Sequence, residues 1–385
     1  MRRSAHSKIR AAQLAAALSL APLAGSAQQG VTCAEGRCTK MIYGSEPATV
    51  RLRVNGHGPV TVLGGASKDY SYVIKVTIRA RSEGDARRVL ANYTVKTSRQ
   101  GEWFVLTAPG GAAMSAITMK APHLEHAAIS TSDGAVDASG IDGSLEIDSQ
   151  GGALSCDRVR GDCKMVTGGG PIFVGQVNGG ARCATEAGNI TVASVGGEAV
   201  LQTKGGDILA KQVGGAVQAE TGGGGVRVDS AGGAVTAVSG GGQIQIGKAG
   251  GVVTIQNMAG PVQVGSAAGV RCESGSGVVR VTNIYGPMRV STLMGSIFAS
   301  LMGSEPGESY LATGNGDITV MIASNVGVNI RAENRVADIR RIVSEFPGIP
   351  VRVLGARVVA EGPVNGGGPL LGITGTGGTI FIKRQ

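Results

Sequence analysis

The stretch that decides the fold is TKGGDILAKQVGGAVQAE, residues 203–220, followed directly by TGGGGVRVDSAGGAVTAV, residues 221–238. Both segments have 18 residues and begin with a threonine three positions before a glycine. The same register extends in both directions along the chain. Its hydroxyl positions are Thr131, Ser149, Thr167, Thr185, Thr203, Thr221 and Ser239, and Asn257, Ser274, Thr292 and Thr313 continue the series after small changes of step. A period sustained over so many units indicates a repeat architecture.

Glycine recurs at two fixed places in each unit. The first lies three residues after the hydroxyl position, at Gly134, Gly152, Gly170, Gly188, Gly206, Gly224, Gly242 and Gly260. The second lies nine residues further on, as at Gly215 and Gly233. We interpret the first set as structural turn glycines and expect positive φ angles there, because glycine adopts φ > 0 without steric cost. Each unit is therefore expected to consist of two half-coils.

Apolar residues alternate with other residues after each first glycine, as in Ile208/Ala210 and Val226/Val228. Alternation at period two predicts strands with one buried face. The predicted fold is all-β: a single-stranded parallel β-helix, or β-solenoid, with 18-residue coils. We expect it to be right-handed, because right-handed crossovers dominate between parallel strands.

Four segments are predicted along the chain. Residues 1–27 resemble a signal peptide, with Arg2, Arg3 and Lys8 before an apolar run at 15–23 and small residues at 25–27. Residues 28–130 form a β-rich N-terminal segment, residues 131–320 the repeat array, and residues 321–385 a C-terminal cap. The chain is therefore expected to be exported to the periplasm, the cell surface or the extracellular space.

The two flanking segments carry their own predicted elements. The N-terminal segment is expected to contain a short helix at residues 85–91, and its concentration of aromatic residues indicates a globular core of its own. In the C-terminal cap we expect a helix at residues 336–346 and a final strand at residues 379–382.

The charge of the chain argues against nucleic acid as a partner. Removing the four basic residues of the signal lowers the net charge from +9 to +5 (9 − 4), and the remaining Lys and Arg are scattered among Asp and Glu. A nucleic-acid binder would concentrate basic and aromatic residues in a stripe. No transmembrane segment is expected after cleavage, because the apolar run is short and contains Pro22.

Six cysteines in an exported chain raise the question of disulfides. Cys33 and Cys38 are predicted to close a small loop near the mature N-terminus. The other four, Cys156, Cys163, Cys183 and Cys272, fall inside the array. The first three occupy positions that neighbouring coils fill with small aliphatic residues, so we expect buried apolar side chains and leave their redox state open.

Three groups of motifs together resemble the bacterial putative-adhesin family of exported β-solenoid proteins. They are the Gly-x-Ile-x-Val coils, the run LRVNGHGPVTV at residues 52–62, and the closing GGGP and GTGGTIFI at residues 366–369 and 375–382. The resemblance covers roughly residues 45–385. It implies a β-solenoid fold and an exported location, and it supplies no catalytic residues.

Motifs for chemistry are weak in this sequence. His57, between Gly56 and Gly58, matches a short stretch of polygalacturonase-like enzymes, but a turn between two strands explains it better. Asp207 and Asp317 follow glycines without the full Gly-Gly-x-Gly-x-Asp pattern of calcium-binding repeats. His123 and His126 have H-x-x-H spacing, which we interpret as two exposed histidines and not as a metal site. We therefore predict no catalytic residue, no metal and no cofactor.

The row of Thr and Ser hydroxyls suggests two interpretations. It could be an exposed ladder that binds ice or a flat polymer, or a buried column that satisfies the backbone groups of the turns. We favour the buried column, because a recognition ladder would need threonine at outward strand positions. Those positions hold a mixture, for example Ser155, Phe173 and Arg227.

The leading hypothesis is an adhesin-like, non-catalytic protein that acts as a rigid spacer or binding surface at the cell envelope. Its partner is unknown, with an envelope polysaccharide or another envelope protein as the candidates. One alternative is a carbohydrate-active enzyme with a site built from single residues on several coils, such as Arg158, Asp162, Arg182 and Glu186. Another is a structural subunit that assembles through the ends of the rod, which residues 321–385 would otherwise cover.

Overall fold

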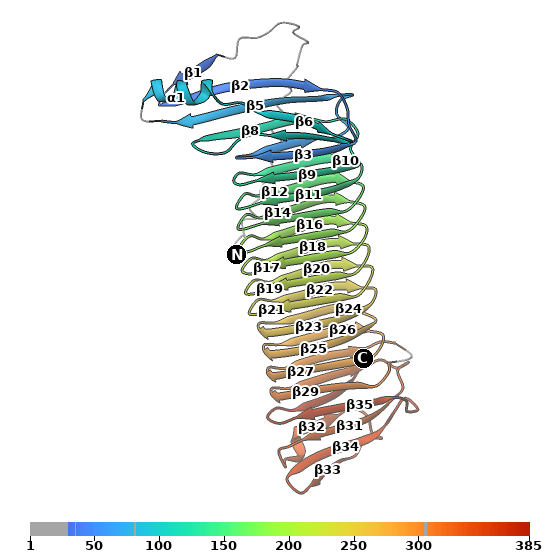
Figure 1. The fold of residues 1–385 in the computed structure, drawn as a ribbon. Helices are drawn as coiled ribbons and strands as arrows, with labels where there is room; N and C mark the ends of the chain where they lie inside the picture. The colour runs from blue at the N-terminus through green and yellow to red at the C-terminus, as the bar shows by residue number, and fades with distance from the viewer. Residues whose placement is uncertain (1–29, 35, 81, 304–305) are drawn as a thin grey trace, which may run out of the picture.

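The computed structural model of the chain describes residues 30–34, 36–80, 82–303 and 306–385, so the predicted signal peptide lies outside the described residues. These residues form a long rod with a cap at each end (Figure 1). About 61% of the residues are in strands, and the β-solenoid has about 11 turns with a coil spacing of about 18 residues. The predicted fold class is confirmed.

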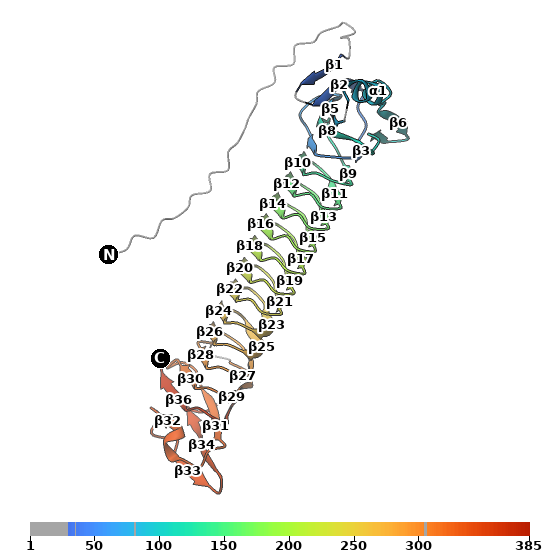
Figure 2. The same cartoon turned by 90° about the vertical axis from the view of Figure 1, so that its left-hand side faces the viewer.

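Two sheets of 18 strands each run along the rod and face each other (Figure 2). In spatial order, sheet A consists of β1 (Val31–Ala34), β2 (Arg37–Glu46), β5 (Tyr70–Arg79), β8 (Ala113–Lys120), β4 (Val60–Leu63), β10 (Val136–Ile141), β12 (Leu154–Val159), β14 (Ile172–Val177), β16 (Ile190–Val195), β18 (Ile208–Val213), β20 (Val226–Ala231), β22 (Ile244–Ala249), β24 (Val262–Ser266), β26 (Val279–Ile284), β28 (Ile297–Leu301), β30 (Ile318–Ile322), β36 (Ile380–Arg384) and β32 (Ile342–Ser344).

Sheet B supplies the other half of each coil. In the same direction it consists of β6 (Lys96–Gln100), β7 (Trp103–Thr107), β3 (Arg51–Gly56), β9 (His126–Thr131), β11 (Ser144–Ser149), β13 (Cys163–Thr167), β15 (Ala181–Thr185), β17 (Ala199–Thr203), β19 (Val217–Thr221), β21 (Val235–Ser239), β23 (Val252–Ala259), β25 (Gly269–Ser276), β27 (Met288–Met294), β29 (Ser309–Asn315), β35 (Leu370–Gly375), β31 (Val328–Asn334), β34 (Arg357–Val364) and β33 (Val351–Leu354).

The strands of the coils pair in parallel, in the register that the sequence predicts. Thr203 lies beside Thr221, and Ile208 beside Val226. The alternating residues point inward: Ile208 and Ala210 are buried, whereas Leu209 between them is half-buried. Each buried Val or Ile contributes about 1.5–3 kcal/mol relative to an exposed one. The stack therefore holds a continuous apolar interior between its two sheets.

At both ends the spatial order of the coils departs from the order of the chain. Strands β3 and β4, within residues 51–63, lie between β7/β8 and β9/β10. Strands β35 and β36, within residues 370–384, lie between β29/β30 and β31/β32. Each inserted coil is hydrogen-bonded on both sides. The predicted boundaries at 130/131 and 320/321 consequently fall inside β9 and β30, because strand pairing continues beyond the recognisable repeat.

The N-terminal segment does not have a core of its own. Tyr70 and Phe104 are fully buried with ring centroids 4.5 Å apart, and they belong to the same hydrophobic cluster as the coils. The expectation of a separate globular core is wrong, since the inserted β3 and β4 join this segment to the array. Antiparallel strands β1, β2, β5 and β6 then cover the end of the stack.

The predicted helix near residue 85 is present as α1 (Glu83–Ala91). Ser82 caps its N-terminus by accepting a hydrogen bond from the backbone of Asp85, at 3.2 Å. At the other end, the buried Lys40 Nζ donates to the carbonyl oxygens of Leu90 (2.9 Å) and Tyr93 (3.1 Å). A cation at this position complements the helix dipole.

The helix predicted at residues 336–346 is wrong. The structure has a single 3₁₀ turn, η1 (Ile339–Arg341), followed by β32. Apolar residues at three- and four-residue spacing imitate a helical face, but Ile339 is 55% exposed while Ile342 is buried. Pairing of Ile342 with Ile380 on β36 outweighs the local helical preference.

At the first glycine position of each coil, glycine is required mainly because successive coils approach each other closely, and less because of a positive φ angle. Only Gly134 and Gly260 of the eight have positive φ angles, of +100° and +107°. At the other six, an added Cβ would lie 1.7–2.2 Å from the carbonyl oxygen of the equivalent glycine one coil earlier; these are Gly152, Gly170, Gly188, Gly206, Gly224 and Gly242. The expected reason for these six glycines is therefore corrected: no side chain fits between the stacked turns.

The Thr/Ser positions form a buried column that is bonded to these glycines. Thr203 Oγ1 donates to the carbonyl oxygen of Gly188 (3.0 Å) and accepts from the N–H of Gly206 (3.1 Å). The same pair of bonds is made by Thr167, Thr185, Thr221 and Ser239. Each hydroxyl thus ties its own turn to the preceding coil. This confirms the buried-column interpretation.

The column is interrupted where the step shortens to 17 residues between Asn257 and Ser274. Among the described residues, Asn257 Oδ1 and Thr292 Oγ1 are the two buried side-chain polar atoms without a hydrogen-bond partner. Met258 and Leu293, which follow these two residues, are more than 70% exposed. Regular bonding between turns is therefore lost in this part of the rod.

Replacing Gly206 by alanine tests the close approach of the turns. We expect Gly206→Ala to lower the free energy of unfolding by roughly 1–3 kcal/mol, because the new Cβ would lie 2.2 Å from the Gly188 oxygen. Gly205→Ala is the matched control, since no atom lies within 4 Å of its Cβ. It should change stability by less than about 0.5 kcal/mol in denaturant titrations followed by circular dichroism. Equal losses in the two variants would contradict the steric explanation.

Replacing Thr203 by valine tests the hydroxyl column. The substitution keeps the shape of the side chain and leaves the Gly188 oxygen and the Gly206 N–H without their partner. We expect a loss of about 1–3 kcal/mol in the same titration. Thr236→Val, at an exposed position of β21, is the control and should be close to neutral. A neutral Thr203→Val would show that the column contributes no stability.

Candidate functional site

The two histidines with H-x-x-H spacing have different partners. His123 Nδ1 lies 2.5 Å from Asp142 Oδ2, whereas His126 Nδ1 lies 2.5 Å from Ser144 Oγ. Within the described part of the chain, no three His, Cys, Asp or Glu side chains are grouped to hold a metal ion. The spacing therefore reflects two separate surface contacts.

His57 lies at the turn between β3 and β4, as predicted. Its Nδ1 contacts Ser132 Oγ on the neighbouring coil. The next residue, Gly58, has a φ of +137°, and an added Cβ would lie 2.6 Å from the Ser115 carbonyl oxygen. Thr131 Oγ1 donates to the Gly58 carbonyl oxygen at 2.8 Å. These contacts give the Gly-His-Gly triplet a structural role in the turn.

The two aspartates that follow glycines are occupied by backbone groups. Asp207 Oδ1 accepts from the N–H of Gly225 (2.7 Å), and Asp317 Oδ1 from the N–H of Thr379 (2.8 Å). Each carboxylate therefore bonds the coil that lies next to it. Charge-assisted bonds of this kind stabilise the turns.

The four residues of the enzyme hypothesis are distributed over three grooves. Asp162 and Arg182 line one groove of about 460 Å³ on the outer face of sheet B. Arg158 lines a second groove of about 530 Å³ at the corner of the coils, and Glu186 a third of about 510 Å³. Glu186 pairs with Lys204 at 2.6 Å, which holds the pKa of its carboxyl below the usual range. The structure thus brings together only Asp162 and Arg182.

Sheet A brings together two carboxylates that no sequence motif predicted. Asp137 on β10 and Asp157 on β12 occupy neighbouring outward columns. Partial burial, and to a lesser extent the charge of Asp157, raise the pKa of Asp137. Asp157 Oδ1 in turn accepts from the N–H of Gln176 at 3.0 Å. The environment of Asp137 thus favours its protonated form.

The N-terminal end of sheet B carries an aromatic and basic surface that the sequence did not predict. Trp103 lies beside Arg51, which lies beside His126, because the inserted β3 separates β7 from β9. The guanidinium of Arg53 lies 4.7 Å from the centre of the Trp103 ring, and the His126 ring meets the indole edge-on at 5.3 Å. Three segments distant in sequence therefore form one surface.

This surface continues along the neighbouring outward column of sheet B, to which Arg53 belongs. In register, Arg53 is followed by Ala128, Glu146, Lys164 and Arg182 on successive coils. We call the set Trp103, Arg51, Arg53, His126, Glu146, Lys164 and Arg182 the sheet B track. Its last members line the groove of about 460 Å³.

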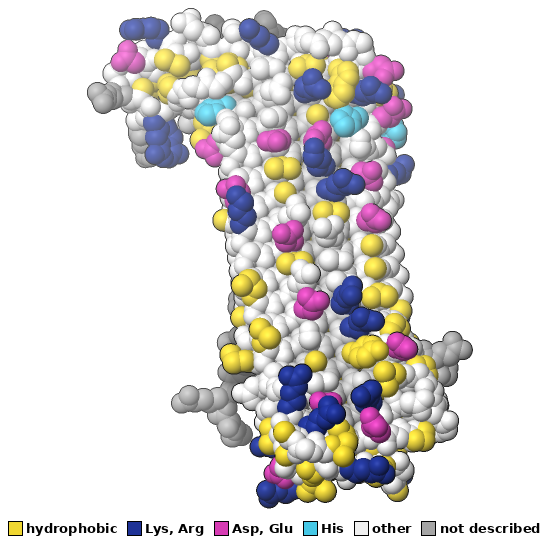
Figure 3. All heavy atoms as spheres, turned by 60° about the horizontal axis from the view of Figure 1, so that its bottom comes forward, with side chains coloured by type: hydrophobic (Ala, Val, Ile, Leu, Met, Phe, Trp, Pro, Cys, Tyr) yellow, Lys and Arg dark blue, Asp and Glu magenta, His cyan; other side chains and the backbone are white. Residues whose placement is uncertain are grey.

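The track carries one acidic residue, Glu146, among its basic residues. Lys164 Nζ lies 2.6 Å from Glu146 Oε1, and this hydrogen bond lowers the pKa of the Glu146 carboxyl. Partial burial lowers the pKa of His126, which favours the neutral imidazole. Arg51 pairs with Glu102 at 3.5 Å, so Arg53 and Arg182 are the cations of the track outside these two ion pairs. Acidic and basic side chains are interspersed over the rod, as Figure 3 shows on one face.

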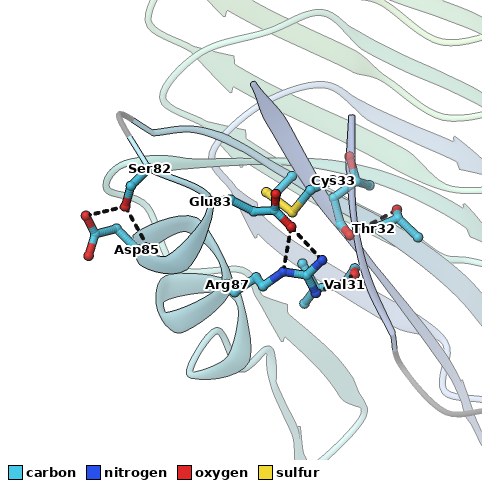
Figure 4. Close-up of a disulfide and its surroundings, with 9 residues drawn as sticks. Val31, Thr32, Cys33, Ser82, Glu83, Asp85 and Arg87 are labelled. Carbon is cyan, nitrogen blue, oxygen red and sulfur yellow. Dashed lines mark hydrogen bonds and ion pairs between the residues drawn. A yellow bond between two sulfur atoms is a disulfide. The ribbon is translucent and has the colours of Figure 1, made fainter. Parts of the chain in front are cut away.

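Cys33 and Cys38 are joined by a disulfide in the β1–β2 hairpin (Figure 4), with their Cα atoms 4.1 Å apart. Helix α1 lies beside this hairpin. Arg87 connects the two, since it pairs with Glu83 at 2.7 Å and donates to the Val31 carbonyl oxygen at 3.2 Å. The disulfide thus lies at the outer end of the N-terminal cap.

Comparison with solved structures finds seven similar chains, including the following two. One is described as a putative adhesin from Bacteroides fragilis NCTC 9343, with 9% identity, 90% of this chain and 97% of that chain covered, and a TM-score of 0.26. The other is described as a putative cell adhesion protein from Clostridium sporogenes ATCC 15579, with 11% identity, 90% and 100% covered, and a TM-score of 0.17. The names agree with the family that the sequence motifs resemble. The TM-scores are too low to carry an argument about function.

No family model and no curated protein matches the chain. In the described ranges, no helix has the length and apolar character needed to cross a membrane. The fold is therefore assigned from the register of the chain's own strands, and the function from its surface.

Proposed function

We propose that the chain is an exported, non-catalytic, adhesin-like protein of the cell envelope whose rod binds an acidic polysaccharide. The observation that carries this proposal is the sheet B track. A polymer with a regular repeat is suited to a surface whose outward positions recur on every coil, because the coils are spaced by about 4.8 Å. The indole of Trp103 offers a face for a sugar ring, and the basic residues offer partners for carboxylates or sulfates.

The architecture supports a rigid presentation of this surface. Parallel ladders connect the track on β3, β9, β11, β13 and β15 without interruption. The backbone of such strands is already ordered, so no binding energy is spent on ordering it. The rest of the rod then acts as a spacer between the track and the C-terminal cap.

Export is supported by the pattern of residues 1–27 and by the disulfide of Cys33 and Cys38, a bond typical of oxidising compartments. Fractionation of cells that carry the tagged chain would test this part of the proposal. Recovery of the uncleaved chain from the cytoplasm would overturn it.

Binding can be tested with immobilised acidic and neutral polysaccharides and the purified protein. We expect retention by acidic polymers that weakens as the salt concentration rises, because the contacts are ionic. Arg53→Gln combined with Arg182→Gln should weaken binding by roughly tenfold or more, equivalent to about 1.4 kcal/mol. Arg271→Gln is the matched control, since Arg271 is exposed on the outer face of the same sheet, on β25.

The same incubation separates the alternatives. New chain ends in the polysaccharide would assign the protein to the carbohydrate-active enzymes, and their loss in Asp137→Asn would locate the acid at the carboxyl pair on sheet A. Concentration-dependent polymers in sedimentation, without retention, would favour the structural subunit. Equal retention of the double variant and the wild type would overturn the track as the binding surface.

A further inference from the structure

Two cysteines of the array face each other inside one coil. Cys156 is on β12 of sheet A and Cys163 on β13 of sheet B, and both are at most 1% exposed. Their Sγ atoms lie 2.9 Å apart. Uncharged heavy atoms that are not bonded pack at about 3.5–4.0 Å. The two sulfurs are therefore closer than packing alone explains.

The equivalent positions in the next coils show what this place in the interior accepts. They hold Val174 with Ala181, and then Val192 with Ala199. All four side chains are buried. Two cysteines fill a similar volume, and this is the one coil in which both members of the pair have sulfur. A covalent link here would need no rearrangement of the neighbouring coils.

The environment disfavours other roles for these thiols. The hydrogen bond with Cys163, together with burial, raises the pKa of the Cys156 thiol, and burial raises that of Cys183 on the next coil. A thiol kept protonated is a poor nucleophile and a poor metal ligand. No third ligand joins the pair in a metal-binding group within the described residues.

We propose that Cys156 and Cys163 form a disulfide that joins the two sheets across the interior of one coil. It forms by thiol–disulfide exchange with an oxidising disulfide. The thiolate of one cysteine attacks that disulfide, and the second cysteine then displaces the mixed disulfide. The two thiol protons pass to the leaving thiolates of the oxidant, which is reduced by two electrons to a dithiol. Because both sulfurs are buried in the finished rod, the reaction precedes closure of the coil.

This disulfide would join the two ends of the turn that lines the groove of about 530 Å³. The loop between the two cysteines holds Arg158, with a φ of +52°, and Arg160, which pairs with Asp142 at 3.1 Å. A cross-link at the base of this turn restricts its opening. In the cell the oxidant comes from the oxidising compartment, and in this respect alone the inference rests on the proposed export.

The test uses the full chain, refolded in glutathione buffers of increasing oxidised fraction until Cys33 and Cys38 are fully linked. Free thiols are then alkylated in acid-quenched denaturant, and the protein is digested with trypsin. Cleavage after Lys120, Arg158, Arg160, Lys164, Arg182 and Lys204 gives separate peptides for Cys156 (121–158), Cys163 (161–164) and Cys183 (183–204). Because the oxidant is supplied in the buffer, the outcome does not depend on export or on polysaccharide binding.

We expect peptides 121–158 and 161–164 to be joined, and Cys183 and Cys272 to be alkylated. Alkylation of both Cys156 and Cys163 in the sample with linked Cys33 and Cys38 would overturn the proposal, as would a link between 121–158 and 183–204.

Thermal unfolding provides an independent readout. In a Cys33→Ser, Cys38→Ser background, a reductant should lower the melting midpoint by roughly 2–8 °C. The matched variant is Cys156→Val combined with Cys163→Ala, which reproduces the pair of the next coil. It should fold and show no reductant effect. A similar effect of the reductant on the matched variant would assign it to another cause and contradict the proposal.

Discussion

The rest of the rod depends on one interaction: the Thr or Ser hydroxyl of a turn bonds a glycine of its own turn and a glycine of the preceding turn. Thr203 bonds both Gly206 of its own turn and Gly188 of the preceding one, and neither glycine leaves room for a Cβ. This arrangement fixes the spacing of the turns. Fixed turns keep the strands of each coil in register, and the register keeps Val, Ile and Ala inside. The outward side chains therefore recur at regular intervals along both sheets.

Function on such a scaffold depends on which outward side chains share a column. The sheet B track arises because β3 is inserted between β7 and β9, which places Trp103, Arg53 and His126 on one surface. Beyond the inserted coil, antiparallel strands cover the end of the stack, where unpaired strand edges would invite aggregation. The outermost strand β6 is fully exposed and carries Lys96 and Arg99, which discourage further pairing. The N-terminal segment thus both caps the rod and builds its candidate binding surface.

The local repeat made the coils predictable, whereas the ends were not. The 18-residue register, the inward positions and the hydroxyl column all follow from spacing along the chain. The inserted coils have no such signal, because pairing between residues 51–63 and residues 126–141 depends on contacts distant in sequence. For the same reason the track was missed: of its members, only His126 and Arg182 were singled out, each for a different kind of site. The helix expected at residues 336–346 failed because pairing with β36 outweighs local spacing.

The central claim is that both terminal coils are integral members of one continuous stack. Hydrogen–deuterium exchange of the intact protein tests it most directly. The backbone amides of a strand that is paired on both sides exchange only when the stack opens. We predict that residues 51–63 and 370–384 exchange as slowly as the central coil at residues 190–213. Exchange of these two segments at the rate of exposed loops would contradict the account, since it would mean that the inserted coils are not hydrogen-bonded on both sides.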